Sequence, residues 1–257
     1  MTYALITGAS KGIGKAFAIE CAKLKFNVLL VARSEQSLKE LAQQLSDQYK
    51  VQADFFAADL STPASAKSIY NWCAEKKYAV NILVNNAGYG LSGKLENYNG
   101  DDYLNMMQVN MITPVYLTQL FLPMLHQQPR SYILNIASTA AYQAVPYLSV
   151  YAATKAFILN YSRGIKQELK KTSISVTCIS PGATDTDFIV RAKIGEKGLK
   201  TAEKLNMTPE AVASIAMKAM LAGKAEVITG FVNKLGAFMV WLMPKNIVER
   251  TAMKIYE

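Results

Sequence analysis

The chain has 257 residues, of which 51% are hydrophobic, and a formal net charge of +9. This length allows one large α/β domain with a substantial core. The basic residues are scattered and form no stripe with interleaved aromatics, which argues against nucleic-acid binding and predicts at most a weak attraction for anionic ligands.

The histidine and cysteine content and the length of the apolar runs exclude further classes of protein. One histidine, His126, is too few for a His-rich metal centre or a probable Ser-His-Asp triad, so no metal site is predicted. The three cysteines are far apart and fit core thiols in a reducing, cytoplasmic compartment. No apolar run is long enough to span a membrane, and the first predicted strand starts so early that no cleaved signal peptide is expected.

Short apolar runs alternate along the chain with longer amphipathic stretches. Strands are predicted over residues 3–7, 27–32, 52–57, 81–85, 131–136, 174–179 and 226–229. Helices are predicted over residues 12–24, 34–48, 62–76, 101–126 (broken near Asn110 and Pro114), 149–170, 208–222 and 234–255. Several strands are apolar throughout, as in parallel sheets buried on both faces. The pattern predicts an α/β fold of Rossmann type, a doubly wound parallel seven-stranded sheet with helices on both faces.

A glycine-rich turn, Thr7-Gly-Ala-Ser-Lys-Gly-Ile-Gly14, follows the first strand. Glycines there allow a tight turn, close approach of the backbone to a pyrophosphate and close packing of helix on strand. The next helix directs free N–H groups toward a phosphate. A glycine-rich turn without a ligand is the alternative, but the position after the first strand favours a dinucleotide site formed by Gly8, Ser10, Lys11, Gly12, Ile13 and Gly14.

The residues after the second strand indicate which dinucleotide is bound. An NAD site needs a carboxylate there for the ribose 2′-hydroxyl. This chain has Arg33 and Ser34 instead, and Lys11 in the glycine turn adds a second cation. A guanidinium can grip a 2′-phosphate with two hydrogen bonds, so NADP(H) is the predicted cofactor.

A hydroxyl, a phenol and an ammonium suggest carbonyl chemistry. Tyr151 and Lys155 are one helical turn apart, and Ser138 follows the fifth predicted strand. Reduction of a carbonyl builds negative charge on oxygen, which needs a proton and a hydrogen-bond donor. A free tyrosine has a pKa of about 10, and a nearby ammonium lowers that pKa. Tyr-x-x-x-Lys pairs also occur by chance, so the prediction depends on the whole set.

Five motifs occur in a set order over residues 3 to about 230: the glycine turn, Asn85-Asn-Ala-Gly88, Ser138, Tyr151-x-x-x-Lys155 and Pro181-Gly182. This order resembles the short-chain dehydrogenase/reductase family in its compact single-domain branch. The resemblance implies that Tyr151 is the acid/base, that Lys155 holds the nicotinamide ribose and tunes Tyr151, and that Ser138 orients the carbonyl. It also implies that Asn110 kinks its helix and holds a water that links Lys155 to solvent.

The resemblance assigns further residues to the cofactor site. Asp59 and Leu60, after the third strand, are expected to flank the adenine. The end of the fourth strand is expected to pass close to the adenosine ribose, at Asn86, Ala87 and Gly88. The turn after the sixth strand is expected to cover the nicotinamide with Pro181, Gly182, Thr184 and Thr186, and residues 183–207 are expected to form a mobile substrate lid.

The expected organisation is one NADP(H)-binding domain over residues 1–257, with an apolar C-terminal extension at 231–257. The segment Leu235–Met243 contains only apolar residues and glycine. It can cap the substrate pocket, lie in a subunit interface or touch a membrane surface, and packing against protein is favoured. A homodimer or homotetramer is expected, with helices 113–126 and 149–170 in the main interface.

The predicted function is that of an NADP(H)-dependent oxidoreductase. It would interconvert a ketone or aldehyde and an alcohol, with a small hydrophobic substrate. A regulatory protein that binds NADP(H) with little turnover is one alternative, against which the intact Ser138, Tyr151 and Lys155 argue. A 3-oxoacyl thioester is the alternative substrate class.

Overall fold

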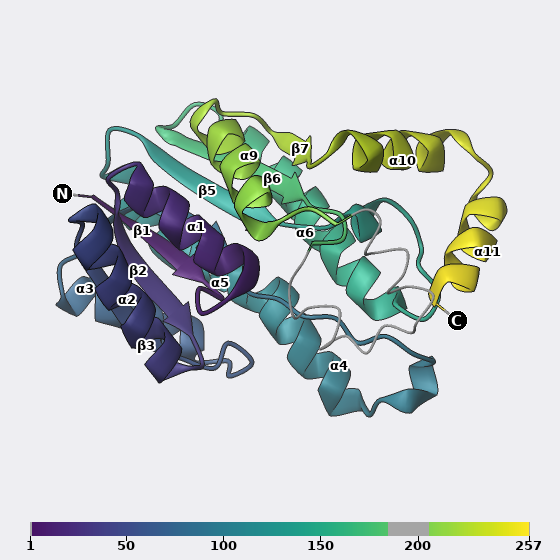
Figure 1. The fold of residues 1–257 in the computed structure, drawn as a ribbon, viewed down its shortest axis with the longest axis horizontal. Coiled ribbons are helices and arrows are strands. Elements are labelled where there is room, and N and C mark those ends of the chain that lie inside the picture. Colours follow the sequence, from purple (N-terminus) through teal and green to yellow (C-terminus); the bar gives the residue numbers. More distant parts are fainter. Residues whose placement is uncertain (1, 185–205, 257) are drawn as a thin grey trace.

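Seven parallel strands form one sheet in the order β3-β2-β1-β4-β5-β6-β7 (Figure 1). The computed structural model describes residues 2–184 and 206–256. From β1 the chain proceeds outward through β2 to β3 and then returns to the other side of β1 to form β4. Such a switch point opens a crevice at the carboxyl ends of the strands. The strands are β1 (Thr2–Thr7), β2 (Asn27–Ala32), β3 (Ala53–Ala57), β4 (Ala79–Asn85), β5 (Ser131–Ile136), β6 (Ile174–Ser180) and β7 (Glu226–Ile228).

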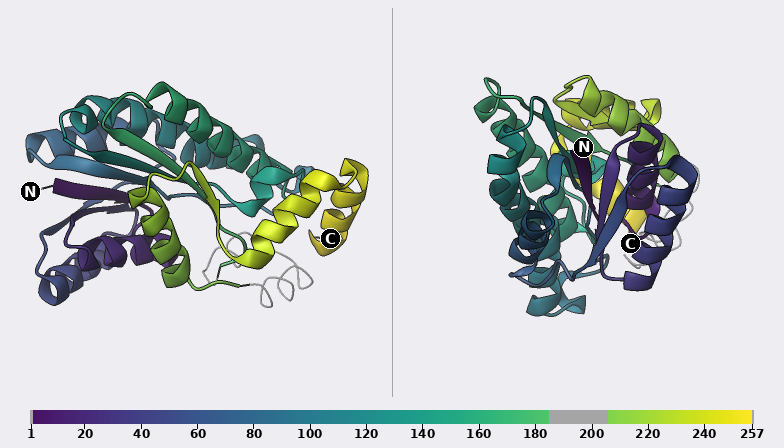
Figure 2. Two further views of the ribbon diagram at one scale, coloured as in Figure 1. Left: turned by 90° about the horizontal axis from the view of Figure 1, so that it is seen from above. Right: turned by 90° about the vertical axis from the view of Figure 1, so that its left-hand side faces the viewer.

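Helices cover both faces of the sheet (Figure 2). One face carries α1 (Gly12–Lys23), α2 (Glu35–Tyr49) and α9 (Pro209–Leu221). The other carries α3 (Ser65–Glu75), α5 (Thr113–His126) and α6 (Ser149–Glu168). Shorter elements lie near the carboxyl ends of the strands: η1 (Leu95–Asn97), α4 (Gly100–Met107), η2 (Gln108–Ile112) and η3 (Thr139–Tyr142).

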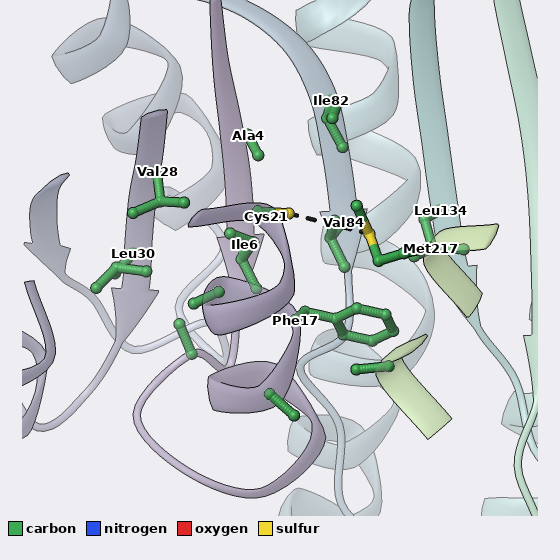
Figure 3. Close-up of a cluster of buried hydrophobic side chains, with 14 of the residues drawn as sticks. Ala4, Ile6, Phe17, Cys21, Val28, Leu30, Ile82, Val84, Leu134 and Met217 are labelled. Carbon is green, nitrogen blue, oxygen red and sulfur yellow. Dashed lines mark hydrogen bonds between the residues drawn. The ribbon is translucent and has the colours of Figure 1, made fainter. Parts of the chain in front are cut away.

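The core consists of two layers because alternate residues of each strand point to opposite faces. Ala4 and Ile6 of β1 pack with Phe17 of α1 and Met217 of α9 on one face (Figure 3). Leu5, between them in the sequence, packs in the cluster on the other face. All three predicted core thiols are buried and free, at Cys21, Cys73 and Cys178.

The predicted Rossmann-type fold is confirmed, and each predicted strand ends within two residues of an observed one. The predicted break near Asn110 is the π-helical turn η2 between α4 and α5. The prediction of one helix over 234–255 is wrong, since the structure has α10 (Phe231–Leu242) and α11 (Lys245–Tyr256). Met243 adopts an extended conformation with φ −87° and ψ 151°. Because Pro244 disfavours helical dihedrals in the residue before it, the helix ends there.

The C-terminal extension projects beyond the sheet and then turns back. Figure 1 shows α10 running past the end of β7 and α11 returning from its far end. Ala252 of α11 is buried in a small apolar cluster with Met106, Leu148 and Tyr151. The extension therefore reaches the elements that carry the predicted catalytic residues.

Candidate active site

A cavity of about 1270 Å³ opens at the carboxyl ends of the strands. It brings together nearly all of the predicted site residues, from seven separate segments of the chain. Asn110 lies behind its wall, and Thr186 lies outside the described residues, as does most of the predicted lid. The predicted residues that line the cavity are Gly8, Ser10, Lys11, Gly12, Ile13, Gly14, Arg33, Ser34, Asp59, Leu60, Asn86, Ala87, Gly88, Ser138, Tyr151, Lys155, Pro181, Gly182 and Thr184.

The glycine turn is packed so tightly that side chains do not fit. Gly8 has a φ of +67°, which favours glycine. A Cβ on Gly14 would lie 2.1 Å from the carbonyl oxygen of Gly8. The amino end of α1 thus sits directly on the turn after β1, and its first residues line the cavity, where a helix amino end favours a phosphate. This cradle fits the pyrophosphate of a dinucleotide.

Hydrogen bonds tie the turn to the end of β4. The Thr7 hydroxyl accepts from the backbone N–H groups of Asn86 and Ala87, at 3.0 and 3.1 Å. The Asn86 amide in turn donates to the carbonyl oxygen of Thr7 at 2.9 Å. Asn86 therefore also holds the glycine turn in place, a role that follows from the neighbouring positions of β1 and β4.

The ends of β2 and β3 supply the polar groups at one end of the cavity. Arg33 and Ser34 follow β2 directly, and both line the cavity with Lys11. The Asp59 carboxylate accepts from the N–H and the hydroxyl of Ser61, at 3.0 and 2.8 Å. Asp59 is the one carboxylate among the described lining residues, and it is bound to the β3 loop. Two cations, Lys11 and Arg33, and one carboxylate, Asp59, thus lie at this end of the cavity.

Tyr151 and Lys155 lie on one face of α6 and are both buried. The Lys155 Nζ donates to the carbonyl oxygen of Ile136 at 2.9 Å and lies 5.7 Å from the centroid of the Tyr151 ring. Burial lowers the pKa of Lys155 to about 8, because a desolvated ammonium is less stable than the neutral amine. Lys155 can therefore lie beside the Tyr151 phenol as an ammonium or as a neutral amine, depending on the pH.

Asn110 lies in the π-helical turn, where an extra residue redirects side chains. Its Oδ1 accepts from the N–H of Tyr89 at 3.1 Å, and its Nδ2 donates to the carbonyl oxygen of Tyr89 at 2.9 Å. The same Nδ2 donates to the Thr154 hydroxyl at 3.0 Å. A Cβ on Gly88 would lie 3.1 Å from the Asn110 Oδ1 and 3.2 Å from the Lys155 Nζ, so both groups lie close behind Gly88.

Ser138 begins the short helix η3 at the end of β5. Its hydroxyl accepts from the N–H of Ala140 at 3.1 Å. The next residue, Thr139, donates its N–H to the carbonyl oxygen of Pro181 at 2.9 Å. Ser138 is thus fixed relative to the Pro181-Gly182 turn.

Tyr142 is a lining residue that the sequence did not predict. Its hydroxyl donates to Glu226 Oε1 at 2.6 Å and lies 3.1 Å from the Ser180 hydroxyl. Burial and the hydrogen bond to Glu226 raise its pKa above the ordinary value for tyrosine. No motif marks Tyr142, because its partner Glu226 lies 84 residues away in the sequence.

The opposite side of the cavity is mainly apolar. It is formed by the segment after η3, by α10 and by α11, including Val145, Leu148, Val240, Met243 and Ala252. The charged residues among the described lining are Lys11, Arg33, Asp59 and Lys155, and none lies on these elements. This side suits an uncharged apolar group.

Residues 2–184 and 206–256 contain neither a metal site nor a membrane-spanning helix. That part of the chain contains no cluster of three or more histidine, cysteine or acidic residues placed to hold a metal ion. Its helices are too short or too polar to cross a membrane.

Comparisons with known proteins agree with this geometry. The family model for short chain dehydrogenase matches residues 2–197. An uncharacterized oxidoreductase of Staphylococcus epidermidis is 34% identical over 194 residues, which cover 76% of this chain and 83% of that protein. An NADP-dependent 3-hydroxy acid dehydrogenase of Schizosaccharomyces pombe is 31% identical over 223 residues, 84% of this chain and 85% of that protein.

A solved structure has the same fold over almost the whole chain. The structure of a 7β-hydroxysteroid dehydrogenase, determined in work on its stereoselectivity, superposes with a TM-score of 0.87 at 26% identity. The superposition covers 98% of this chain and 96% of the other, and so includes the length of the C-terminal extension. The fold, the motifs and these matches lead to one conclusion: the chain belongs to the short-chain dehydrogenase/reductase family, a family of oxidoreductases.

Proposed function

We propose that the chain is an NADP(H)-dependent reductase of an uncharged, apolar ketone, with the reverse oxidation of the alcohol at the same site. One observation carries the proposal: Ser138, Tyr151 and Lys155 line the same cavity as the glycine turn. The bound dinucleotide would supply the hydride that attacks the carbonyl carbon. All other steps would use groups of this chain.

Tyr151 would donate its phenolic proton to the carbonyl oxygen as negative charge develops there. The Ser138 hydroxyl would hydrogen-bond the same oxygen and hold it toward Tyr151. The Lys155 ammonium would stabilise the phenolate that Tyr151 leaves behind, because an opposite charge nearby favours the ionised form. Asn110, which lies close to Gly88 as Lys155 does, would hold the water that links Lys155 to solvent.

NADP(H) is favoured over NAD(H) by the residues at the ends of β1 and β2. Arg33 and Lys11 line the cavity there, and Asp59, the one carboxylate among the described lining residues, follows β3 and is bound to Ser61. The S. pombe relative is also NADP-dependent by name. The apolar substrate side favours a ketone such as a steroid over a charged thioester carrier, in line with the 7β-hydroxysteroid dehydrogenase structure.

The test is consumption of NADPH, and separately of NADH, with bulky apolar ketones and with 3-oxoacyl thioesters. We expect turnover with NADPH and the apolar ketones. Tyr151→Phe keeps the ring and removes the proton, so its turnover should fall by about 10²–10⁴-fold while NADPH still binds. Near-normal turnover of Tyr151→Phe would exclude Tyr151 as the acid. NADPH binding by the wild type without turnover of any carbonyl would favour a regulatory protein.

A further inference from the structure

The helix α10 is apolar almost all round and has no buried residue. Of its twelve residues, Asn233 and Lys234 alone have polar side chains. Phe231 and Trp241 are 80% and 78% exposed, values far above those of core aromatics. A helix that is hydrophobic on every side normally lies inside protein. In the described structure, much of the apolar surface of α10 therefore remains exposed to solvent.

One side of α10 forms a wall of the cavity. Asn233, Gly236, Ala237 and Val240 line the cavity at helical spacing. Asn233 donates to the carbonyl oxygen of Thr229 at 2.7 Å, and its amide fills the space beside Gly182. The wall is thus anchored at its start, next to the turn expected to cover the nicotinamide.

The other side, here called the outer face, is exposed. It carries five large apolar residues that do not line the cavity and are each at least 50% exposed, with Lys234 among them: Phe231, Leu235, Phe238, Trp241 and Leu242. A buried aromatic side chain removes roughly 150–250 Å² from water, so the three aromatics at 80, 55 and 78% exposure leave roughly 300–550 Å² uncovered. The exposed area of the three aromatics is already as large as the largest apolar patch of an ordinary monomer. The two leucines increase the exposed apolar area toward the roughly 800 Å² that each partner buries in a stable dimer.

The composition of α10 favours protein over lipid as the cover. A helix that lies on a membrane surface has a strongly charged face opposite its apolar one. Here the face opposite the outer face is the cavity wall, and the helix has one charge, Lys234. The outer face also follows β7, which is the last strand of the sheet in the described part of the chain and has one edge unpaired there. Every copy of the chain has the same apolar face beside the same sheet edge, so two copies can cover each other by a two-fold contact.

We propose that the outer face of α10 packs against a second copy of the chain and that this contact holds the cavity wall in place. A twelve-residue helix without tertiary packing is marginal in water, because most helix stability in proteins comes from packing. Without the partner copy the wall would be loose and the substrate side of the site incomplete. Affinity for the substrate would then depend on assembly, whereas the glycine turn would bind dinucleotide regardless.

The test replaces one outer-face residue and one exposed apolar residue elsewhere. Trp241→Glu places a charge in the proposed contact without touching the cavity lining. Leu24→Glu is the matched control, since Leu24 is 47% exposed at the end of α1, away from the cavity. We expect Trp241→Glu to halve the mass measured by sedimentation equilibrium, and Leu24→Glu and Trp241→Phe to keep the wild-type mass. NADPH affinity should be unchanged in all three.

The kinetic part of the test rests on the proposed reductase function. With a ketone that the wild type reduces, the KM of Trp241→Glu should rise by about tenfold or more, because a loose wall must be ordered on binding. If the wild type reduces no ketone, the proposed function fails, but the mass comparison still decides the assembly. An unchanged mass for Trp241→Glu would overturn the proposal. Binding of the wild type to anionic phospholipid vesicles, lost in Trp241→Glu at constant mass, would assign the outer face to lipid instead.

Discussion

The surroundings of Lys155 change the charge that this side chain carries near pH 8. Burial lowers its pKa to about 8, so the ammonium form dominates below that pH and the neutral amine above it. Tyr151 and Cys178 are its titratable neighbours, and burial raises the pKa of the Cys178 thiol to about 12, which keeps that thiol neutral in this range. The site therefore loses its buried positive charge as the pH rises through about 8.

If Lys155 holds the nicotinamide ribose, NADPH binding should follow this titration. We expect the Kd for NADPH to increase as the pH passes upward through about 8, because the neutral amine is a weaker donor than the ammonium. Lys155→Met should bind NADPH more weakly at low pH and lack this transition. Titrations of NADPH at a series of pH values check both statements. A transition of equal size in Lys155→Met would assign it to another group.

Among the elements, η3 connects Ser138 to the far edge of the sheet. Ser138 caps its start, and Tyr142 ends it with hydrogen bonds to Ser180 of β6 and Glu226 of β7. Both ends of η3 are thus attached to strands that also carry the Pro181 turn and lead into α10. Tyr142 is a positioning residue in this arrangement, since it holds the segment on which Ser138 depends.

We expect Tyr142→Phe to lower kcat/KM for the ketone by about tenfold, because small displacements of positioned groups have large kinetic effects. NADPH affinity should stay the same. Glu226→Gln keeps an oxygen that accepts from Tyr142 and should retain most activity, whereas Glu226→Ala should resemble Tyr142→Phe. Kinetics of Tyr142→Phe, Glu226→Ala and the double variant form a cycle, in which fully additive losses would mean that the two residues do not act together.

Elements with a local signal could be predicted from the sequence. The glycine turn and the Tyr151–Lys155 pair are defined by spacing within a few residues, and the apolar runs gave every strand to within two residues. The contact of Tyr142 with Glu226 could not be predicted, because it depends on β6 and β7 being neighbours. The break between α10 and α11 had a local signal in Pro244, but the amphipathic pattern around it predicted one helix.

At the scale of the whole molecule, we expect assembly through two exposed apolar regions. The first is the outer face of α10. The second lies on α5 and α6, where Tyr116 and Phe157 are 40% and 37% exposed and Phe157 stacks on Tyr161 with ring centroids 6.1 Å apart. The family resemblance predicts the main two-fold interface on these two helices, and this stays a prediction. Two two-fold contacts on one chain generate a tetramer with three mutually perpendicular axes when the axes of the two contacts are perpendicular and intersect.

If both contacts form, the tetramer that they generate should divide along either one. Phe157→Glu should disrupt the α5–α6 contact and leave dimers joined through α10, because the two regions lie on different elements. Phe157 does not line the cavity, so these dimers should keep the wild-type KM for the ketone, unlike the dimers of Trp241→Glu. The double variant should be monomeric. Sedimentation equilibrium and parallel kinetic measurements check the expected masses and KM values of these variants. An unchanged mass for Phe157→Glu would exclude α5 and α6 from the interface.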